Sequence, residues 1–265
     1  MNSVITLISD YGSDSIYTAS MLGKAAALLP ETKVISISHQ IPDFDLSMSA
    51  FLLKSVYLDF PVGTFHLICV DCSLALHKQL LLVEMNGHYF LGADNGIFSL
   101  LFDSTPTKVY KLLIAPELEN DLFVEKNIFL PLIANFLKKG DLKGLAEPSS
   151  IVTEKQSISA IYTENSIEGT VMYVDGYQNA ITNITKDLFL KVGSNRPFIL
   201  YYWGKHSISK ISTHFHDGKS GDELMLFNEN GNLLIAMYKG KGARLLGLKP
   251  SSKIMLQFEG ETNEI

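Results

Sequence analysis

Arginine is scarce in this chain of 265 residues, because only Arg196 and Arg244 stand among its 22 basic residues. Acidic residues number 28, and the formal net charge is −6. Nucleic-acid binding depends on clustered Arg and Lys side chains that neutralise phosphates. We therefore expect no nucleic-acid partner, and any cation that acts in the first 195 residues has to be Lys or His.

Long apolar runs and glycine-rich phosphate loops are also missing. No stretch approaches the roughly 18 apolar residues of a membrane span. The first residues, MNSV, lead directly into a strand pattern, without the basic segment or the cleavage site of a secretory signal. Neither the P-loop nor the dinucleotide-binding glycine pattern occurs. We expect a soluble, cytoplasmic protein without a membrane partner.

Cysteine occurs only as Cys69 and Cys72, a pair that His66 and His77 flank at a spacing that imitates a zinc site. Residues 64–71 have the pattern of a buried strand, in which side chains three positions apart point to opposite faces. The four groups then cannot converge on one ion. We prefer two packed thiols in a reducing compartment and expect no metal; a metal site or a redox pair are the alternatives.

The first 140 residues alternate between strand and helix patterns. A hydrophobic content of 46% is enough for a large core. The Asn86-Gly87 pair indicates a tight hairpin between two of the strands. Strands are expected at residues 4–9, 33–37, 64–71, 80–85, 89–91 and 109–112, and helices from 15, from 45, after 95 and near 126–139. This order predicts an α/β domain, with a mostly parallel sheet covered by helices on both faces.

The pattern changes after Gly140. Residues 144–150 (GLAEPSS) are typical of a linker, and β patterns dominate from about residue 158 onward. Turn sequences such as NENG at 228–231 separate these strands at regular spacing. We expect a domain at 1–145, a linker at 146–157 and a C-terminal antiparallel β-barrel or sandwich at 158–265.

Acidic residues follow several strands of the first domain. Ligands of open parallel sheets bind outside the carboxyl ends of the strands. Each acid alone is an ordinary turn or helix-cap residue. Together they favour a site for hydroxyl groups and cations, because one carboxylate accepts two hydrogen bonds from a vicinal diol. These acids are Asp10, Asp43, Asp45, Asp71 and Asp94.

Five blocks of the sequence, in order along most of the chain, resemble one known family. They are residues 5–12 (ITLISDYG), 35–42 (ISISHQIP), 92–96 (GADNG), 174–184 (VDGYQNAITNI) and 233–247 (LLIAMYKGKGARLLG). These blocks resemble the S-adenosylmethionine (SAM) hydroxide adenosyltransferases, which are relatives of the bacterial fluorinase and chlorinase. The expected pair of an α/β and a β domain agrees with this resemblance.

The resemblance implies a homotrimer that binds a small nucleoside ligand between the N-terminal domain of one subunit and the C-terminal domain of its neighbour. On the N-terminal side, Asp10 would hold the ribose diol and Phe44 would supply an aromatic side chain beside the sugar. On the C-terminal side, Asp175 would meet the methionine ammonium. Asn179 and the backbone near Met237–Lys239 would contact adenine.

Tyr177 also fits an aromatic wall of this ligand site, although packing on its own barrel explains a tyrosine there equally well.

The sequence departs from the family at the residues implied for catalysis. Hydrolysing members surround the attacking water with Asp, Arg and His. Here Asp71 occupies the Asp position, Lys78 the Arg position and Val124 the His position, and the glycines of the loop between Asp71 and Lys78 are gone. Lysine lacks the planar, bidentate donor of arginine. His77 or Glu125 are the neighbouring groups that would substitute.

Two functions follow from the resemblance. The first is an enzyme that hydrolyses SAM to adenosine and methionine by water attack at C5′, slowly in the absence of the usual partners of Asp71. It takes SAM as its substrate and needs no cofactor. The alternative is a non-catalytic protein that binds adenosine or SAM. Halogenation is not expected, because the charge of Glu125 would repel a halide.

Overall fold

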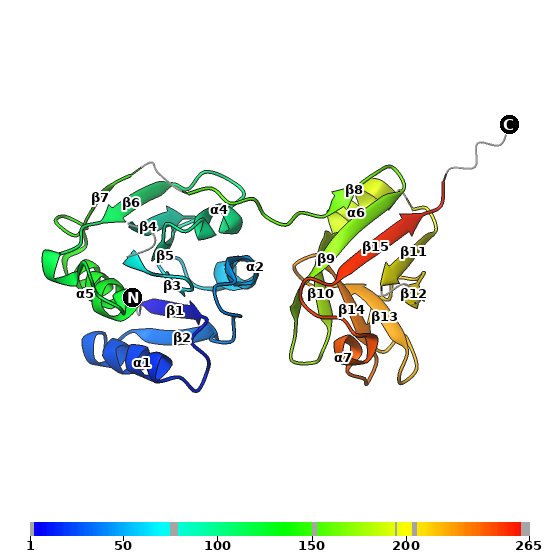
Figure 1. The fold of residues 1–265 in the computed structure, drawn as a ribbon, viewed down its shortest axis with the longest axis horizontal. Coiled ribbons are helices and arrows are strands. Elements are labelled where there is room, and N and C mark those ends of the chain that lie inside the picture. The colour runs from blue at the N-terminus through cyan, green and yellow to red at the C-terminus, as the bar shows by residue number, and fades with distance from the viewer. Residues whose placement is uncertain (1–2, 75–78, 150–152, 194, 203–205, 261–265) are drawn as a thin grey trace. The chain divides into compact units, whose positions relative to one another are not determined.

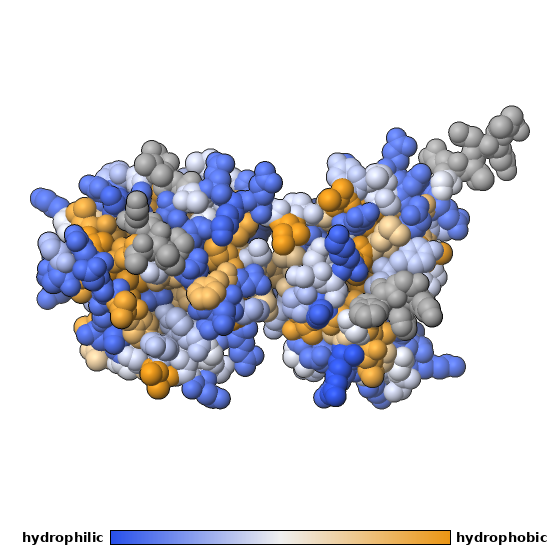
Figure 2. Space-filling view, in the orientation of Figure 1, coloured by the Kyte–Doolittle hydropathy of each residue, from blue (hydrophilic) through white to orange (hydrophobic). Residues whose placement is uncertain are grey.

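The computed structural model describes residues 3–74, 79–149, 153–193, 195–202 and 206–260, in two compact units, 1–157 and 158–265 (Figure 1). The fold class predicted from the sequence is confirmed. On the visible face of each unit, hydrophobic residues form separate patches between hydrophilic ones (Figure 2). Among the described residues, no helix has both the length and the apolar character of a membrane span.

A seven-stranded mixed sheet forms the centre of the N-terminal unit. Its order is β2-β1-β3-β5-β4-β6-β7, with parallel pairing from β2 to β5 and antiparallel pairing from there to β7. The strands are β1 (Val4–Ser9), β2 (Lys33–Ser38), β3 (Phe65–Cys69), β4 (Leu80–Met85), β5 (His88–Ala93), β6 (Lys108–Leu112) and β7 (Ala146–Pro148). The predicted hairpin joins β4 and β5, because Asn86 and Gly87 adopt the positive φ values of 52° and 77° that its tight turn requires.

Helices cover both faces of this sheet. Met21 and Ala25 of α1 (Ile16–Leu28) and Ile133 of α5 (Leu130–Lys139) join a core cluster with Leu7 and Leu67 of the central strands. On the opposite face, Phe98 lies against Ile68 and Gly92. The helical segments are α1 (Ile16–Leu28), α2 (Leu46–Val56), η1 (Tyr57–Asp59), α4 (Ile97–Leu101), η2 (Pro116–Leu118), the π-helix η3 (Glu125–Phe129) and α5 (Leu130–Lys139).

Antiparallel strands form the C-terminal unit, in the order β12-β11-β15-β9-β10-β14-β13, with β8 added to β9. The Tyr202 hydroxyl, at the end of β11, donates a hydrogen bond to Glu223 of β13, so the sheet curls into a nearly closed barrel. The strands are β8 (Ile161–Tyr162), β9 (Ser166–Val174), β10 (Ala180–Thr185), β11 (Phe198–Tyr202), β12 (His206–Ile208), β13 (Glu223–Phe227), β14 (Asn232–Met237) and β15 (Lys253–Phe258). Two short helices, α6 (Lys186–Gly193) and α7 (Gly242–Leu246), interrupt them.

Three local features differ from the sequence analysis. The first residues of the expected linker form β7, which pairs with β6. Strand β3 ends at Cys69, earlier than predicted, because Asp71 turns the chain with a φ of 47°. The helix expected near 126–139 begins as the π-helix η3.

Candidate functional site

Two of the predicted site residues leave the sheet side by side. Strands β1 and β3 are parallel neighbours, with Ser9 in register with Cys69. Asp10 comes directly after β1, and Asp71 comes two residues after β3. The structure therefore places both carboxyl groups at the carboxyl edge of the two central strands, where ligands of such sheets bind.

Asp10 also holds the loop that follows β2. Its Oδ2 accepts a hydrogen bond from the backbone amide of Phe44 at 3.1 Å. Phe44 has a φ of 62°, which is unfavourable for a bulky residue, and its side chain is 69% exposed. Strained backbone of this kind concentrates at functional sites. The structure thus brings Phe44 to Asp10, as the assignment of both to one ligand requires.

Other acids at the strand ends have structural partners. Asp45 caps α2 by accepting a hydrogen bond from the amide of Met48 at 2.9 Å. Asp94 is buried and accepts the amide of Thr153 at 2.6 Å, so it fixes the segment beyond β7. Asp43 is exposed. Of this set, Asp10 and Asp71 are the two acids that follow the adjacent parallel strands β1 and β3.

Asn95 is a residue of this edge whose role the sequence analysis missed. Its side-chain amide donates to the backbone carbonyls of Asp71 at 3.0 Å and Val70 at 3.2 Å. Its Oδ1 accepts the amide of Ile97 at the start of α4. Asn95 thereby ties the turn at Asp71 to α4, and the Asp-Asn-Gly sequence at 94–96 is the only signal that marks it.

Val124 is buried in the core of the N-terminal unit. Its side chain is 1% exposed and belongs to the core cluster with Leu7 and Phe129. The next residue, Glu125, has a buried carboxyl group that accepts a hydrogen bond from the Tyr11 hydroxyl at 2.5 Å. The predicted residue Lys78 and its neighbour His77 lie outside the described residues.

The electrostatics around Glu125 are unusual. Burial raises the pKa of Glu125 to about 7, and the negative charges of Asp10 and Asp121 act in the same direction. The hydrogen bond from Tyr11 opposes this shift. Burial and the nearby Glu125 in turn raise the pKa of Tyr11 above its ordinary value. A carboxyl group with a pKa near neutrality is suited to proton transfer.

The two cysteines are free thiols. Because β3 ends at Cys69, the expectation that the two side chains point to opposite faces is wrong: Cys69 and Cys72 pack against the same core cluster. Burial raises the pKa of both thiols, and the charge of Glu125 adds to this. His66 lies on the other face of β3, where its Nδ1 is 2.7 Å from the Thr6 hydroxyl. Of the three described residues of this set, His66 therefore points away from the two thiols, and His77 lies outside the described residues.

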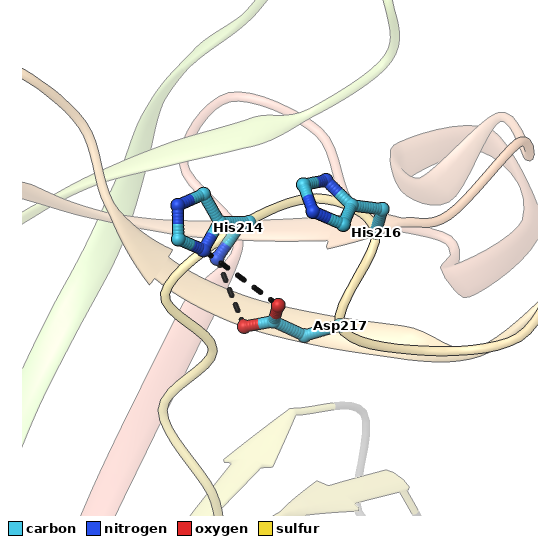
Figure 3. Close-up of side chains that lie close together, drawn as sticks. All are labelled: His214, His216 and Asp217. Carbon is cyan, nitrogen blue, oxygen red and sulfur yellow. Dashed lines mark hydrogen bonds and ion pairs between the residues drawn. The ribbon is translucent and has the colours of Figure 1, made fainter.

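One cluster of potential metal ligands occurs among the described residues, in the turn after β12 (Figure 3). His214, His216 and Asp217 are all exposed, and their ligating atoms lie within 4.8 Å of one another. Asp217 already accepts hydrogen bonds from the amides of Thr213 and His214, at 2.7 and 2.9 Å. The carboxylate therefore shapes the turn. The sequence analysis did not predict a ligand set at this His-x-His-Asp sequence.

A cavity of about 1020 Å³ opens beside α4 and β6 in the N-terminal unit. Phe102, Lys108, Tyr110, Pro148 and Lys155 are among the residues that line it. None of the described site residues predicted from the sequence is among those that line it.

The predicted residues of the C-terminal unit gather at one end of its sheet. Asp175 organises the turn before β10: its Oδ1 accepts the amides of Tyr177 and Asn179, and its Oδ2 accepts the Asn179 side chain at 2.9 Å. Tyr177 is 83% exposed.

Strand β14 continues from the same end of the sheet into the turn at Met237 and Lys239, since Ala180 pairs with Ile235. The Ala243 amide donates to the Gln178 carbonyl at 2.7 Å and fastens the two turns together.

The protein is of a two-domain class. An α/β unit carries carboxyl groups at adjacent strand ends, and a β-barrel unit with a polar turn follows it. The SAM hydroxide adenosyltransferase N-terminal domain matches residues 5–146, and the C-terminal domain of the same family matches residues 169–255. The chain belongs to the SAM hydroxide adenosyltransferase family.

Relatives with assigned names align over nearly the whole chain. A protein of Methanocaldococcus jannaschii is 23% identical over 256 residues, which is 92% of either chain, and one of Salinispora tropica is 24% identical over 94% of this chain and 96% of its own. Both are named (R)-S-adenosyl-L-methionine hydrolase.

Solved structures support the fold. An uncharacterized conserved protein from Thermotoga maritima superposes with a TM-score of 0.84, at 23% identity, over 96% of this chain and 99% of its own. A conserved hypothetical protein from Thermus thermophilus superposes with a TM-score of 0.71, at 23% identity, over 97% of this chain and 100% of its own.

Proposed function

We propose that this protein hydrolyses SAM to adenosine and methionine by attack of water at C5′. The observation that carries the proposal is the match of both domains of one family in order, together with relatives named as SAM hydrolases over more than 90% of the chain. The placement of Asp10 and Asp71 at neighbouring strand ends supports it.

In this proposal Asp10 binds the ribose diol with Phe44 beside the sugar, because one carboxylate can accept both hydroxyl groups. Asp71 anchors the attacking water, and Lys78 takes the position of the cationic partner. In the C-terminal unit, Asp175 contacts the ammonium group of the methionine part. Tyr177 contributes to the aromatic wall of the ligand site.

Asn179 and the backbone at Met237–Lys239 contact adenine in the same proposal. The polar turn that Asp175 organises and the adjoining turn after β14 support this group of contacts.

The reaction as proposed needs no cofactor, since a sulfonium is already a good leaving group and water is the only co-substrate. We further propose a cytoplasmic homotrimer in which each ligand site is shared between neighbouring subunits. Two free thiols fit a reducing compartment. Light scattering of the full chain tests the assembly: a trimer is expected, and a monomer that hydrolyses or binds SAM at full strength contradicts the shared site.

The direct test is incubation of the full chain with each sulfonium epimer of SAM in H₂¹⁸O, followed by mass spectrometry. Equimolar adenosine and methionine are expected, with ¹⁸O in the 5′-hydroxyl of adenosine and none in methionine. Binding by calorimetry without any product identifies a non-catalytic binding protein instead. Absence of both binding and product contradicts the proposed function as a whole.

A further inference from the structure

At the start of η3, Glu125 follows Val124, the residue that the family resemblance places at the His position. Val124 points into the hydrophobic core, where it is 1% exposed. Glu125 follows and turns its carboxyl group to Tyr11, directly after Asp10 at the end of β1. The acidic group that reaches the carboxyl edge of the central strands from this helix is therefore Glu125.

Two donors hold this carboxyl group and leave it capacity for more. The Tyr11 hydroxyl donates to Oε1 at 2.5 Å, and the backbone amide of Glu125 itself also donates to the side chain. A carboxylate has about four lone-pair positions. The remaining positions can accept a proton or a hydrogen bond from a water molecule.

The aromatic contacts of Tyr11 fix the direction of its hydroxyl. Its ring packs against Tyr17 and Phe123, with centroids 5.8 Å away in both cases. A hydroxyl that cannot turn away keeps the carboxyl of Glu125 in one orientation, as a proton acceptor requires.

We propose that Glu125 accepts the proton of the attacking water, with Tyr11 as the residue that positions it; this inference rests on the proposed hydrolysis. The water oxygen forms a bond to C5′ as the C5′–S bond breaks. Sulfur keeps the electron pair of that bond and becomes the neutral thioether of methionine. The proton of the water passes to the Glu125 carboxylate and then to solvent, so charge balances.

Among the described residues, the groups around Glu125 are almost all neutral or negative. Lys126 is turned away, because its Nζ lies 3.3 Å from the Ser20 hydroxyl and over the ring of Phe123. Burial and this acidic surrounding hold the pKa of Glu125 near 7, so a substantial fraction is ionised at neutral pH and still basic enough to take a proton. Within the described part of the chain, the titratable groups that face Glu125 are Tyr11 and Asp10 after β1, Cys69 and Cys72 at the end of β3, and Asp121 before η3.

The test is the pH dependence of kcat/KM for the full chain and three variants, with SAM affinity measured by calorimetry. The wild type is expected to gain activity with a midpoint near pH 7. Glu125→Gln should lose about 100-fold or more in kcat and show no rise between pH 6 and 8, while SAM binding changes little.

Tyr11→Phe removes a donor that stabilises the carboxylate, so its rise should shift to higher pH while most of the plateau rate is kept. Tyr17→Phe is the matched control, since it keeps the ring packing around Tyr11, and its profile should coincide with the wild type.

Three results overturn the proposal. One is a wild-type rate that does not change between pH 6 and 8, and another is a Glu125→Gln variant that keeps more than a tenth of the wild-type kcat. The third is a Tyr11→Phe profile that coincides with the wild type, and it decides the matter even where Glu125→Gln does not fold. Lack of product from the wild type at every pH contradicts the proposed hydrolysis itself. This outcome is therefore distinct from the three results that overturn only the role of Glu125.

Discussion

The strand-end site and the Asp175 turn are both built around a carboxyl group, yet by opposite means. At the strand ends, Glu125 meets Tyr11 across 114 positions of sequence, and Asp10 meets Phe44 across 34. In the turn, Asp175 meets its partners Tyr177 and Asn179 within four residues. One group is assembled by tertiary folding, and the other is nearly complete in a pentapeptide.

This difference predicts different roles for the two regions. A carboxyl group whose oxygens accept several amide and side-chain hydrogen bonds, as those of Asp175 do, is held in one orientation and is suited to recognition. A buried carboxyl group with a pKa near 7, as in Glu125, exchanges protons around neutral pH. Variants of the first region should change affinity, and variants of the second should change rates and pH dependence.

The largest effect is expected for Asp71→Asn, which should lower hydrolysis by about 10²–10⁴-fold. SAM binding should change little, because the backbone carbonyl of Asp71 accepts from Asn95 and the turn can stay intact. Product assays and calorimetry check both parts. Asp43→Asn, on an exposed strand-end acid, is the control and should behave as the wild type. A rate that survives Asp71→Asn assigns the chemistry elsewhere.

Glu125→Gln should also change stability in a pH-dependent way. Folding raises the pKa of Glu125 from 4.5 to about 7, so the folded state binds more protons between these values. The free energy of unfolding of the wild type therefore falls as pH rises through this window. Relative to the wild type, the variant should gain roughly 3 kcal/mol between pH 4 and pH 8. Urea unfolding at both pH values measures it; a constant difference contradicts a buried, raised carboxyl group.

Asp175→Asn should weaken SAM binding about tenfold or more and leave adenosine binding nearly unchanged. The Asn oxygen can still accept the amides of Tyr177 and Asn179, so the backbone of the turn survives, while the charge for the methionine ammonium and the acceptor for the Asn179 side chain are lost. Calorimetry with both ligands decides. Asp175→Ala, which also removes the acceptor, should weaken both. Equal losses of SAM and adenosine affinity in Asp175→Asn would show that Asp175 only organises the turn and does not contact the methionine ammonium.

The smallest effect is expected for Tyr177→Leu. The side chain is 83% exposed, so the free energy of unfolding should stay within about 0.5 kcal/mol of the wild type. Adenosine affinity should fall a few-fold if the ring stacks on the ligand. Thermal melting and calorimetry separate the two effects. Lower stability with unchanged affinity would show that Tyr177 packs on its own barrel.

Sequence patterns predict the local part of this molecule well. The β4–β5 hairpin follows from Asn86-Gly87, whose residues tolerate positive φ, and the strands of both units follow from short apolar runs. The two-unit organisation is visible as a change from alternating helices and strands to strands alone.

What the sequence could not show depends on long-range packing and on single-residue shifts. Val124 and Glu125 are adjacent, and only the start of the π-helix η3 decides which of them faces the core. In the same way, β3 ends at Cys69, and Cys72 packs against the core, although a continued strand would point its side chain to the opposite face. The hydrophobic periodicity of the sequence does not predict the hydrogen bond between Tyr11 and Glu125.

Strand β7 has a consequence for behaviour at high concentration. An exposed sheet edge is a template for pairing with another chain, and proteins protect such edges with short strands and prolines. Strand β7 has three residues and ends in Pro148, which has no amide hydrogen to donate. The opposite edge, β2, is six residues long and contains no proline. Edge-to-edge aggregation of this unit is therefore disfavoured at β7, and β2 is the edge from which it would start.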